Sequence, residues 1–324
     1  MALIRHEMNQ CGRKAVPFLF AVNFEMSEGL FLKTGLETSE VFYQVGNIGH
    51  KPPGLSPARP GPLIARPPDP EEYLGKFRIV QRGLRRGDSY LTNLTLKTPV
   101  DCPLTLKDIF LLSDSPYRLH LPGRFVCFSP ERFVQIKEGR ISTNPMKGTI
   151  DASLPEAEAG ILADFKETAE HNTIVDLLRN DLSRWADGVQ VARFRYIDRI
   201  VARERTILQV SSEIVGTLPP DYLSSLGDII FSLLPAGSCT GAPKGATVRL
   251  IKQAEGEERG YYTGVFGLFD GRALDSAVLI RFIEEDAAGR KFFRSGGGIT
   301  AYSRWEDEYR EVLEKIYLPF GNHD

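Results

Sequence analysis

Two pairs of carboxylates stand three residues apart in the sequence, at a spacing that suits a helix. Glu167 and Glu170 precede His171 and the apolar segment IVDLLRNDL, and Glu308 and Glu311 lie in the segment WEDEYRE. Residues three apart share one face of a helix, so each pair offers oxygen ligands to one side. Such hard ligands suit Mg²⁺, which binds one or two carboxylates, water and an anionic substrate. For an isolated helix, a solvated face with salt bridges is the commoner alternative.

A run of three glycines, Gly296, Gly297 and Gly298, is a candidate anion-binding segment. Because these residues have no Cβ atoms, their backbone N–H groups are open to a bound anion. A flexible turn is the alternative, and it is the better interpretation of a glycine run taken alone. Together with the carboxylate pairs, the glycines suggest a metal-bridged carboxylate or phosphate ligand and nothing narrower.

Other classes of site and partner are not indicated. The formal net charge of −2 requires no basic face, so a nucleic-acid partner is not expected. GAPKGAT lacks phosphate-loop spacing, GVFGLFDG is not a dinucleotide fingerprint, and neither HExxH nor G-x-S-x-G occurs. The four scattered cysteines argue against a zinc site or a disulfide framework and fit a reducing compartment. Without a signal-peptide core or an apolar stretch of about 18 residues, we expect a cytoplasmic protein with no membrane partner.

The carboxylate pairs need helices to position them. Apolar periodicity predicts one helix from about Leu162 to Trp185, which holds the first pair. A last helix should begin at Ser303, with Glu306 completing a capping box. Its second carboxylate pair should lie on the flank of a core-facing stripe that consists of Trp305, Tyr309, Val312 and Ile316. A further helix is expected over Ala242 to Ala254.

One compositional break, the proline-rich run from Lys51 to Pro70, could separate two domains. The segment before it is too short for a good core of its own, so we expect a surface loop (51–70) within one domain spanning residues 1–324. A helix should follow, with Asp69 as N-cap, Pro70 at the first helical position and Glu72 in a capping box. Its apolar stripe comprises Tyr73, Phe77, Val80 and Leu84.

The middle of the chain is rich in strand formers. RFVCF, RFVQIKEG and GRISTN alternate or cluster such residues between turn signals, and the stretch from Gly260 to Phe293 is typical of successive hairpins. Strands and helices do not alternate in a βαβ rhythm. The pattern therefore favours an α+β fold with antiparallel sheets over a doubly wound one.

Eight segments occur in one order along the chain: GDSYLTNLT, SPERF, NPMKGT, AEHNTIVDLLRNDL, PAGSCTGAPKG, RGYYTGVFG, the IRF around Arg281, and GGGITAYSRWEDEYRE. In combination they resemble the chorismate-utilising enzyme family, from about Glu71 to Ile316. The resemblance implies a single α+β domain of two packed antiparallel sheets with helices outside and a cleft that binds chorismate. Within the family, the chain is most similar to component I of the aminodeoxychorismate synthases.

The resemblance also implies roles for individual residues. It implies Mg²⁺ ligands at Glu170, Glu308 and Glu311, with Glu167 near enough to assist through water. It implies contacts with the substrate carboxylates from Thr240, Tyr262, Arg281, Gly296, Gly297 and Gly298. This set is chemically sensible, because chorismate is a dianion whose carboxylates need a cation, an arginine and backbone donors.

Two further positions would decide the reaction. Glu131 of SPERF matches the carboxyl group that protonates the departing hydroxyl, which works best with a raised pKa. Lys147 of NPMKGT matches a lysine that attacks ring carbon C2 in aminodeoxychorismate synthases, where anthranilate synthases usually have alanine. Such a nucleophile must be neutral, so the pKa of Lys147 should be lowered. A lysine that only forms a salt bridge is the alternative.

The implied activity is synthesis of 4-amino-4-deoxychorismate from chorismate and ammonia, with a glutamine amidotransferase subunit as the ammonia-supplying partner. Alternatives are an anthranilate synthase component I, an isochorismate-type synthase, or an inactive chorismate-binding subunit. Lys147 argues against the first, and the intact set of site residues argues against the last. One departure is Gln209, which stands where the family usually has a histidine and cannot transfer a proton.

Overall fold

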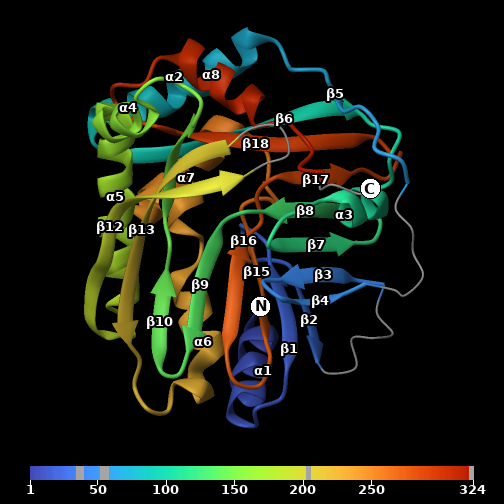
Figure 1. Cartoon of the computed structure of the whole chain (residues 1–324), viewed down its shortest axis with the longest axis vertical. Coiled ribbons are helices and arrows are strands. Elements are labelled where there is room, and N and C mark those ends of the chain that lie inside the picture. Colours follow the sequence, from blue (N-terminus) through green and yellow to red (C-terminus); the bar gives the residue numbers. More distant parts are fainter. Residues whose placement is uncertain (34–39, 52–57, 202–205, 321–324) are drawn as a thin grey trace.

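The computed structural model describes residues 1–33, 40–51, 58–201 and 206–320 of the chain (Figure 1). Two antiparallel sheets of nine strands each form its centre. The first sheet contains β1 (Phe18–Val22), β2 (Gly29–Lys33), β9 (Arg132–Lys137), β10 (Arg140–Thr143), β11 (Met146–Asp151), β12 (Asp187–Val201), β13 (Thr206–Thr217), β15 (Val265–Phe269) and β16 (Leu274–Val278). Its order is β11-β13-β10-β9-β16-β15-β1-β2, with β12 also paired to β13.

The second sheet collects the remaining strands. They are β3 (Phe42–Val45), β4 (Ile48–His50), β5 (Ile64–Ala65), β6 (Leu91–Asp101), β7 (Tyr117–Leu121), β8 (Phe125–Ser129), β14 (Gly241–Ala242), β17 (Phe282–Glu285) and β18 (Lys291–Ile299). Their order is β14-β6-β18-β17-β8-β7-β3-β4, with β5 paired to β6. In Figure 1 the strands of this sheet run across those of the first.

Helices cover the outer faces of both sheets. They are α1 (Ala2–Arg13), α2 (Pro70–Arg86), α3 (Leu106–Leu112), α4 (Ala157–Ala163), α5 (Phe165–Leu182), α6 (Leu226–Leu233), α7 (Lys244–Glu255) and α8 (Trp305–Glu314), with short 3₁₀ turns at Tyr222–Ser225 and Gly237–Cys239. No helix in the described part of the chain is long and apolar enough to cross a bilayer. The structure confirms the expected α+β class, with two packed antiparallel sheets and flanking helices.

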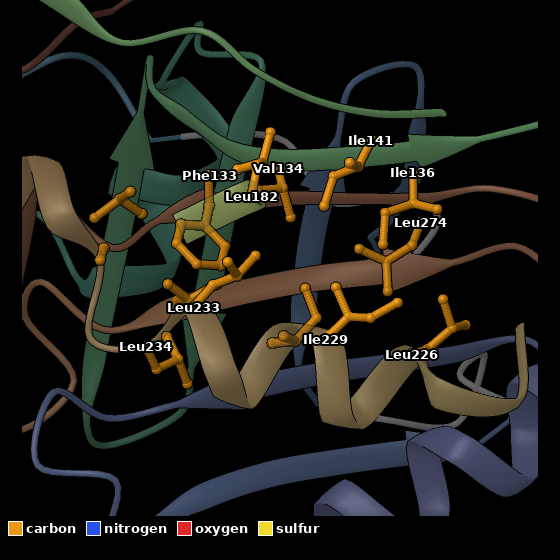
Figure 2. Close-up of a cluster of buried hydrophobic side chains, with 14 of the residues drawn as sticks. Phe133, Val134, Ile136, Ile141, Leu182, Leu226, Ile229, Leu233, Leu234 and Leu274 are labelled. Atoms are coloured by element: carbon orange, nitrogen blue, oxygen red, sulfur yellow. The ribbon is translucent and has the colours of Figure 1, made fainter. Parts of the chain in front are cut away.

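A layer of buried side chains joins the two sheets face to face. It contains Leu19, Ala21, Phe266, Leu268 and Ala277 from the first sheet, and Tyr43, Leu119, Phe125, Cys127 and Phe282 from the second. A separate core lies on the outer face of the first sheet, where α6 packs (Figure 2). There Leu226, Ile229 and Leu233 of α6 meet Ile136, Ile141 and Leu274 of the strands. Because apolar burial is the main favourable term in folding, the first layer holds the two sheets together and the second holds α6 on the first sheet.

Helices α2 and α8 share a core with the sheet strands that run toward the site. Tyr73, Phe77, Val80 and Leu84 of α2 pack with Leu94 of β6, Ile299 of β18 and Val312 of α8. This packing confirms the apolar stripe expected for α2, and it holds α8 against β18 (Figure 1).

Several expected helix ends are wrong. Asp69 does cap α2, but it accepts from the backbone N–H of Glu71, and Glu72 pairs with Lys76 at 2.9 Å rather than forming a capping box. The last helix begins at Trp305 with Arg304 as N-cap, because the hydroxyl of Ser303 accepts from the backbone N–H of Thr300 at 3.0 Å.

The expected long helix is present as α5, within three residues of the expected ends. Its start is set by Asp164, whose carboxylate accepts from the backbone N–H of Glu167, and α4 precedes it as a separate short helix. The two hairpins expected between residues 260 and 293 are present as β15–β16 and β17–β18. Of the proline-rich run, residues 52–57 lie outside the described part, and the remainder is mostly exposed, with Ile64–Ala65 paired to β6.

Candidate active site

The two carboxylate pairs, far apart in sequence, meet between α5 and α8. Glu170 of α5 and Glu308 of α8 are 3% and 1% exposed, and Glu311 lies one turn further along α8. The ammonium of Lys166 stands among them: its Nζ is 2.7 Å from Glu308 Oε1, 3.5 Å from Glu170 Oε1 and 3.6 Å from Glu311 Oε2. Glu308 is therefore buried, and the alternative of a solvated face does not hold for this carboxylate.

Charge and burial compete at these carboxylates. Burial raises the pKa of Glu308. Burial would also raise the pKa of Glu311, but the charges of Lys315 and Lys166 outweigh it and lower that pKa to about 2. The cluster thus contains ionised oxygens in a place with little water, which favours a bound cation.

The glycine run is a strand and not a turn. Gly296, Gly297 and Gly298 belong to β18, where they lie opposite Thr95, Leu94 and Asn93 of β6. On the other side of β18, pairing with β17 ends at Arg294, so no strand in the described part of the chain pairs with that edge at the glycines. That edge offers N–H groups without side-chain obstruction, as anion binding requires.

The close approach of a carboxylate is what requires glycine at position 298 of β18. A Cβ atom on Gly298 would lie 2.5 Å from Glu170 Oε2, and one on Gly297 would lie 3.4 Å from Glu311 Oε1. Any side chain at Gly298 would therefore push Glu170 out of place. The glycines and the carboxylates form one site, in which the backbone of β18 faces the ends of α5 and α8.

The chemistry of these ligands fits a hard divalent cation. Glu170 Oε1 and Glu308 Oε2 are buried oxygens that accept no hydrogen bond from the described part of the chain. Such oxygens are costly to leave unpaired, and carboxylates are the ligands that Mg²⁺ prefers. As the side chains stand, no three His, Cys, Asp or Glu residues among those described converge at metal-binding distances, because the Lys166 ammonium lies between the carboxylates.

Lys147 projects from a bulge in β11 next to this cluster. The β11–β13 register shifts between Lys147 and Thr149, and Gly148 there has φ +76°, which a glycine adopts without strain. The Lys147 side chain is 16% exposed, and its Nζ lies 3.2 Å from Glu170 Oε2. In β13, Gln209 lies opposite Thr149, and its neighbour Val210 lies opposite Lys147.

The expectation of a lowered pKa for Lys147 is wrong for the side chains as they stand. Burial alone would lower the pKa, but the negative charges of Glu170, Glu167 and Glu311 outweigh burial and raise it. The sequence motif gave no sign of how many carboxylates would surround the amine. With these carboxylates as neighbours, Lys147 is a charged partner of Glu170.

Glu131 lies across the site from the carboxylate cluster, at the start of β9. Burial raises its pKa, against a hydrogen bond from Ser238 and the positive charges of Lys147, Arg281 and Lys315. A carboxyl group with a raised pKa holds its proton more readily, which suits it to protonate a leaving oxygen. The pKa direction expected from the sequence therefore agrees with the environment of Glu131.

The other candidate substrate contacts lie on strained or tightly held backbone. Arg281 has φ +50° and Thr263, which follows Tyr262, has φ +59°. Non-glycine residues in this region cost free energy and cluster at functional sites. The Arg281 guanidinium lies over the ring of Tyr317, 5.2 Å from its centroid. Thr240 is fully buried and donates its hydroxyl hydrogen to the carbonyl of Ala236 at 2.8 Å, which leaves only acceptor capacity for a ligand.

Sequence reasoning missed three residues of the site. Lys166 stands among the carboxylates, Ser238 bonds Glu131, and Lys315 donates to the carbonyl of Gly296 at 2.8 Å and to Glu311 Oε1 at 2.7 Å. The two lysines lie inside or beside the helices that carry the carboxylates, four residues before Glu170 and four after Glu311. That i,i+4 spacing is a usable signal, but it is equally typical of surface ion pairs.

A buried ion pair holds the substrate-facing segments together from behind. Arg259 is 1% exposed and pairs with Glu255 at 2.6 Å. It also donates to the carbonyls of Asn93 and Cys239 at 2.7 and 2.8 Å, while Glu255 accepts from the backbone N–H of Thr95. The pair therefore ties β6, which supports the glycine run, to the turn before Thr240.

Comparisons with known proteins agree with this geometry. A family model described as chorismate binding enzyme matches residues 37–320. An uncharacterized PabA-like protein of Haemophilus influenzae is 48% identical over 323 residues, which cover 98% of this chain and 97% of that protein. The aminodeoxychorismate synthase component 1 of Salmonella typhimurium is 32% identical over 262 residues, which cover 76% of this chain and 56% of that protein. A solved anthranilate synthase component I from Streptococcus pneumoniae has a TM-score of 0.66 and 28% identity, covering 79% of this chain and 59% of that one. The chain belongs to the family of chorismate binding enzymes.

Proposed function

We propose that this chain is an aminodeoxychorismate synthase component I, which converts chorismate and ammonia to 4-amino-4-deoxychorismate and water. The observation that carries the proposal is that a lysine with a side chain only 16% exposed, Lys147, shares the site with Glu131, a carboxyl group whose pKa burial raises. Displacement of a hydroxyl group needs a nucleophile, which the primary amine can supply, and a general acid, which the carboxyl group can supply.

The proposed reaction has two displacements. The Lys147 amine attacks C2 of the ring, both conjugated ring double bonds shift, and the C4–O bond breaks while Glu131 gives its proton to the departing oxygen. Ammonia then forms a bond to C4, the double bonds return, the C2–N bond to Lys147 breaks, and the ammonium formed at C4 gives a proton back to Glu131. One molecule of water leaves, and Lys147 is regenerated. The glycines of β18 and Arg281 would hold the two substrate carboxylates through backbone N–H groups and the guanidinium.

Glu170, Glu308 and Glu311 would hold one Mg²⁺ in this proposal. The ion would supply positive charge to a substrate carboxylate and would offset the carboxylate charges that raise the pKa of Lys147. The supporting observation is that oxygens of Glu170, Glu308 and Glu311 already surround one cation, the Lys166 ammonium, at 2.7–3.6 Å. Burial and the charge of Glu170 raise the pKa of Glu167. This carboxylate lies beside Lys147 and could take up a proton from its ammonium.

Ammonia would come from a separate glutamine amidotransferase subunit. A glutaminase needs an activated thiolate. Burial raises the pKa of Cys239 to about 12 and also raises the pKa of Cys127 and Cys11, so none of these three thiols is poised to attack glutamine. The purified chain should therefore turn over with ammonium and should use glutamine only when the partner is added.

Anthranilate synthase activity is the second candidate, and one observation favours it. Lys147 forms a charged pair with Glu170, which is what a lysine with no nucleophilic role would do. Incubation with chorismate, Mg²⁺ and ammonium, followed by mass spectrometry and NMR of the product, separates the two. The proposal requires 4-amino-4-deoxychorismate, with the enolpyruvyl group retained. Anthranilate and pyruvate as the main products would refute it.

A further inference from the structure

The buried carboxylates of the site depend on one particular cation. Glu170 and Glu308 come from different helices, α5 and α8, and both are nearly inaccessible. Buried carboxylates are strongly unfavourable unless a cation compensates them. Within the described part of the chain, the ion pair of Glu308 is with Lys166 alone, and Lys166 also reaches Glu170 and Glu311. Its ammonium is the group that links the two helices electrostatically.

The other two lysines of the site are held differently. Lys315 donates to the carbonyl of Gly296 and to Glu311 Oε1, on the side of α8 that faces β18. Lys147 is 16% exposed, and among the described residues its ion pair is with Glu170. Lys166 is 29% exposed and lies in the first turn of α5, so its flexible side chain can reach solvent by rotating about its own bonds.

The Lys166 ammonium also takes the space that a metal ion would need. A Mg²⁺ ion binds carboxylate oxygens at about 2.0–2.1 Å, inside the volume that three such oxygens enclose. The Lys166 Nζ stands 2.7–3.6 Å from an oxygen of each of the three carboxylates. An ammonium nitrogen and a metal ion cannot share that volume.

We propose that Lys166 is a built-in substitute cation, which holds the carboxylates of α5 and α8 together in the metal-free enzyme and must leave when the metal binds. This inference rests on the magnesium site proposed above. Lys166 is thus a positioning residue that sets both the stability of the metal-free site and its affinity for the ion. Removal of its charge should lower the stability of the metal-free site and raise the affinity of the site for the ion.

The test compares Lys166→Gln with wild type and with Lys76→Gln. Lys76→Gln removes the same charge, from an i,i+4 pair with Glu72 on α2. In the described part of the chain, no ion pair joins Lys76 to the carboxylates of the site. Mn²⁺ is titrated into metal-free protein, and the free Mn²⁺ is measured by electron paramagnetic resonance. The titration is done once without chorismate and once with chorismate, both in the absence of ammonium. Melting temperatures are measured in excess chelator. Neither readout depends on turnover.

We expect Lys166→Gln to bind Mn²⁺ roughly tenfold more tightly than wild type, a coupling of ordinary size between two mutually exclusive ligands. Its metal-free form should melt lower by about 2–4 °C. Lys76→Gln should match wild type in affinity. Lys166→Arg should bind Mn²⁺ no more tightly than wild type, because a guanidinium pairs with carboxylates at least as well as an ammonium.

The outcomes separate this inference from the proposed metal site. Equal or weaker Mn²⁺ binding by Lys166→Gln overturns the exchange while the metal site stands. An unchanged melting temperature in chelator overturns the stabilising role of Lys166. If neither wild type nor Lys166→Gln binds Mn²⁺ under either condition, both the metal site and the exchange are wrong.

Discussion

Substitution of Gly298 by alanine should displace Glu170 without straining the backbone. The φ angle of Gly298 lies outside the left-handed region, so only the space around the new Cβ matters. That atom would lie 2.5 Å from Glu170 Oε2 and 3.2 Å from Leu91 Cδ1. An ordinary contact is about 3.5 Å, so the carboxylate must retreat by roughly 1 Å. Its partner Lys147 at 3.2 Å would have to follow or lose the ion pair.

Two opposing terms set the stability of this variant. Overpacking of a buried position costs about 1–3 kcal/mol, and replacing a glycine returns about 0.4–1 kcal/mol through the unfolded chain. A net loss of about 1 kcal/mol lowers the melting temperature by roughly 2–4 °C. Turnover should suffer more, by about a hundredfold, because a displacement of this size at a reacting centre has that effect.

The matched control is Gly297→Ala, one residue earlier in the same strand. Its Cβ would meet Glu311 Oε1 at 3.4 Å and Glu308 Oε2 at 3.7 Å, which are ordinary contacts. We expect its melting temperature to be unchanged or slightly higher. Thermal unfolding in chelator and chorismate consumption with ammonium are measured for both variants. If Gly298→Ala melts and turns over like wild type, the packing of Glu170 against β18 described above is wrong.

Three further predictions follow from the site. Lys147→Ala should lose most product formation while still binding chorismate, and Lys147→Arg should do no better because arginine stays charged; near-normal turnover of either variant contradicts the nucleophilic role. A general acid must be protonated to act, so the rate should fall as pH rises through the pKa of Glu131, which burial raises. If Glu131→Gln shows the same fall in rate at high pH, Glu131 is not the general acid. Burial lowers the pKa of His120 and of His171 from 6.5 to about 4, so the unfolded chain binds more protons between these values. The free energy of unfolding, measured in urea, should therefore be highest above pH 6.5 and decrease as pH falls toward 4. The decrease should be smaller in His171→Gln.

Local structure could be predicted from the sequence, but the assignment of strands to sheets could not. Turn signals and β-formers gave both hairpins between residues 260 and 293. They did not indicate that Val265–Phe269 and Leu274–Val278 join one sheet while Phe282–Glu285 and Lys291–Ile299 join the other. Periodicity states which face of a strand is apolar and carries no information on its partner. The exchange of sheets between Val278 and Phe282 is a consequence of tertiary packing.

The helix ends were the least predictable local feature. Ser303 is a good N-cap residue by type, yet its hydroxyl is used by the backbone N–H of Thr300 and the helix starts two residues later. Asp164 is an equally ordinary residue that divides an otherwise continuous helical pattern. Cap residues compete for several nearby donors, and tertiary context decides among them.

At the site, the residue types were predictable and their surroundings were not. The i,i+3 spacing of Glu308 and Glu311 placed them on one helix face, but the stripe of α8 gave no hint that Glu308 would be 1% exposed against Glu170 and β18. The pKa of Lys147 depends on three carboxylates from α5 and α8, which no local pattern around NPMKGT contains. Lys166 has the spacing of a common surface pair, so its place at the centre of the cluster emerges only from the fold.

The most direct test of the proposed reaction is the mass of the protein itself. Enzyme with Mg²⁺ and chorismate but without ammonia or an amidotransferase has no second nucleophile, so the first displacement should stop at Lys147. Intact-protein mass spectrometry after rapid quenching should show an adduct with the mass of chorismate less one water, and peptide mapping should place it on Lys147. Lys147→Ala should show no adduct. If wild type forms no adduct under any trapping condition while it still turns over with ammonium, covalent catalysis by Lys147 is contradicted.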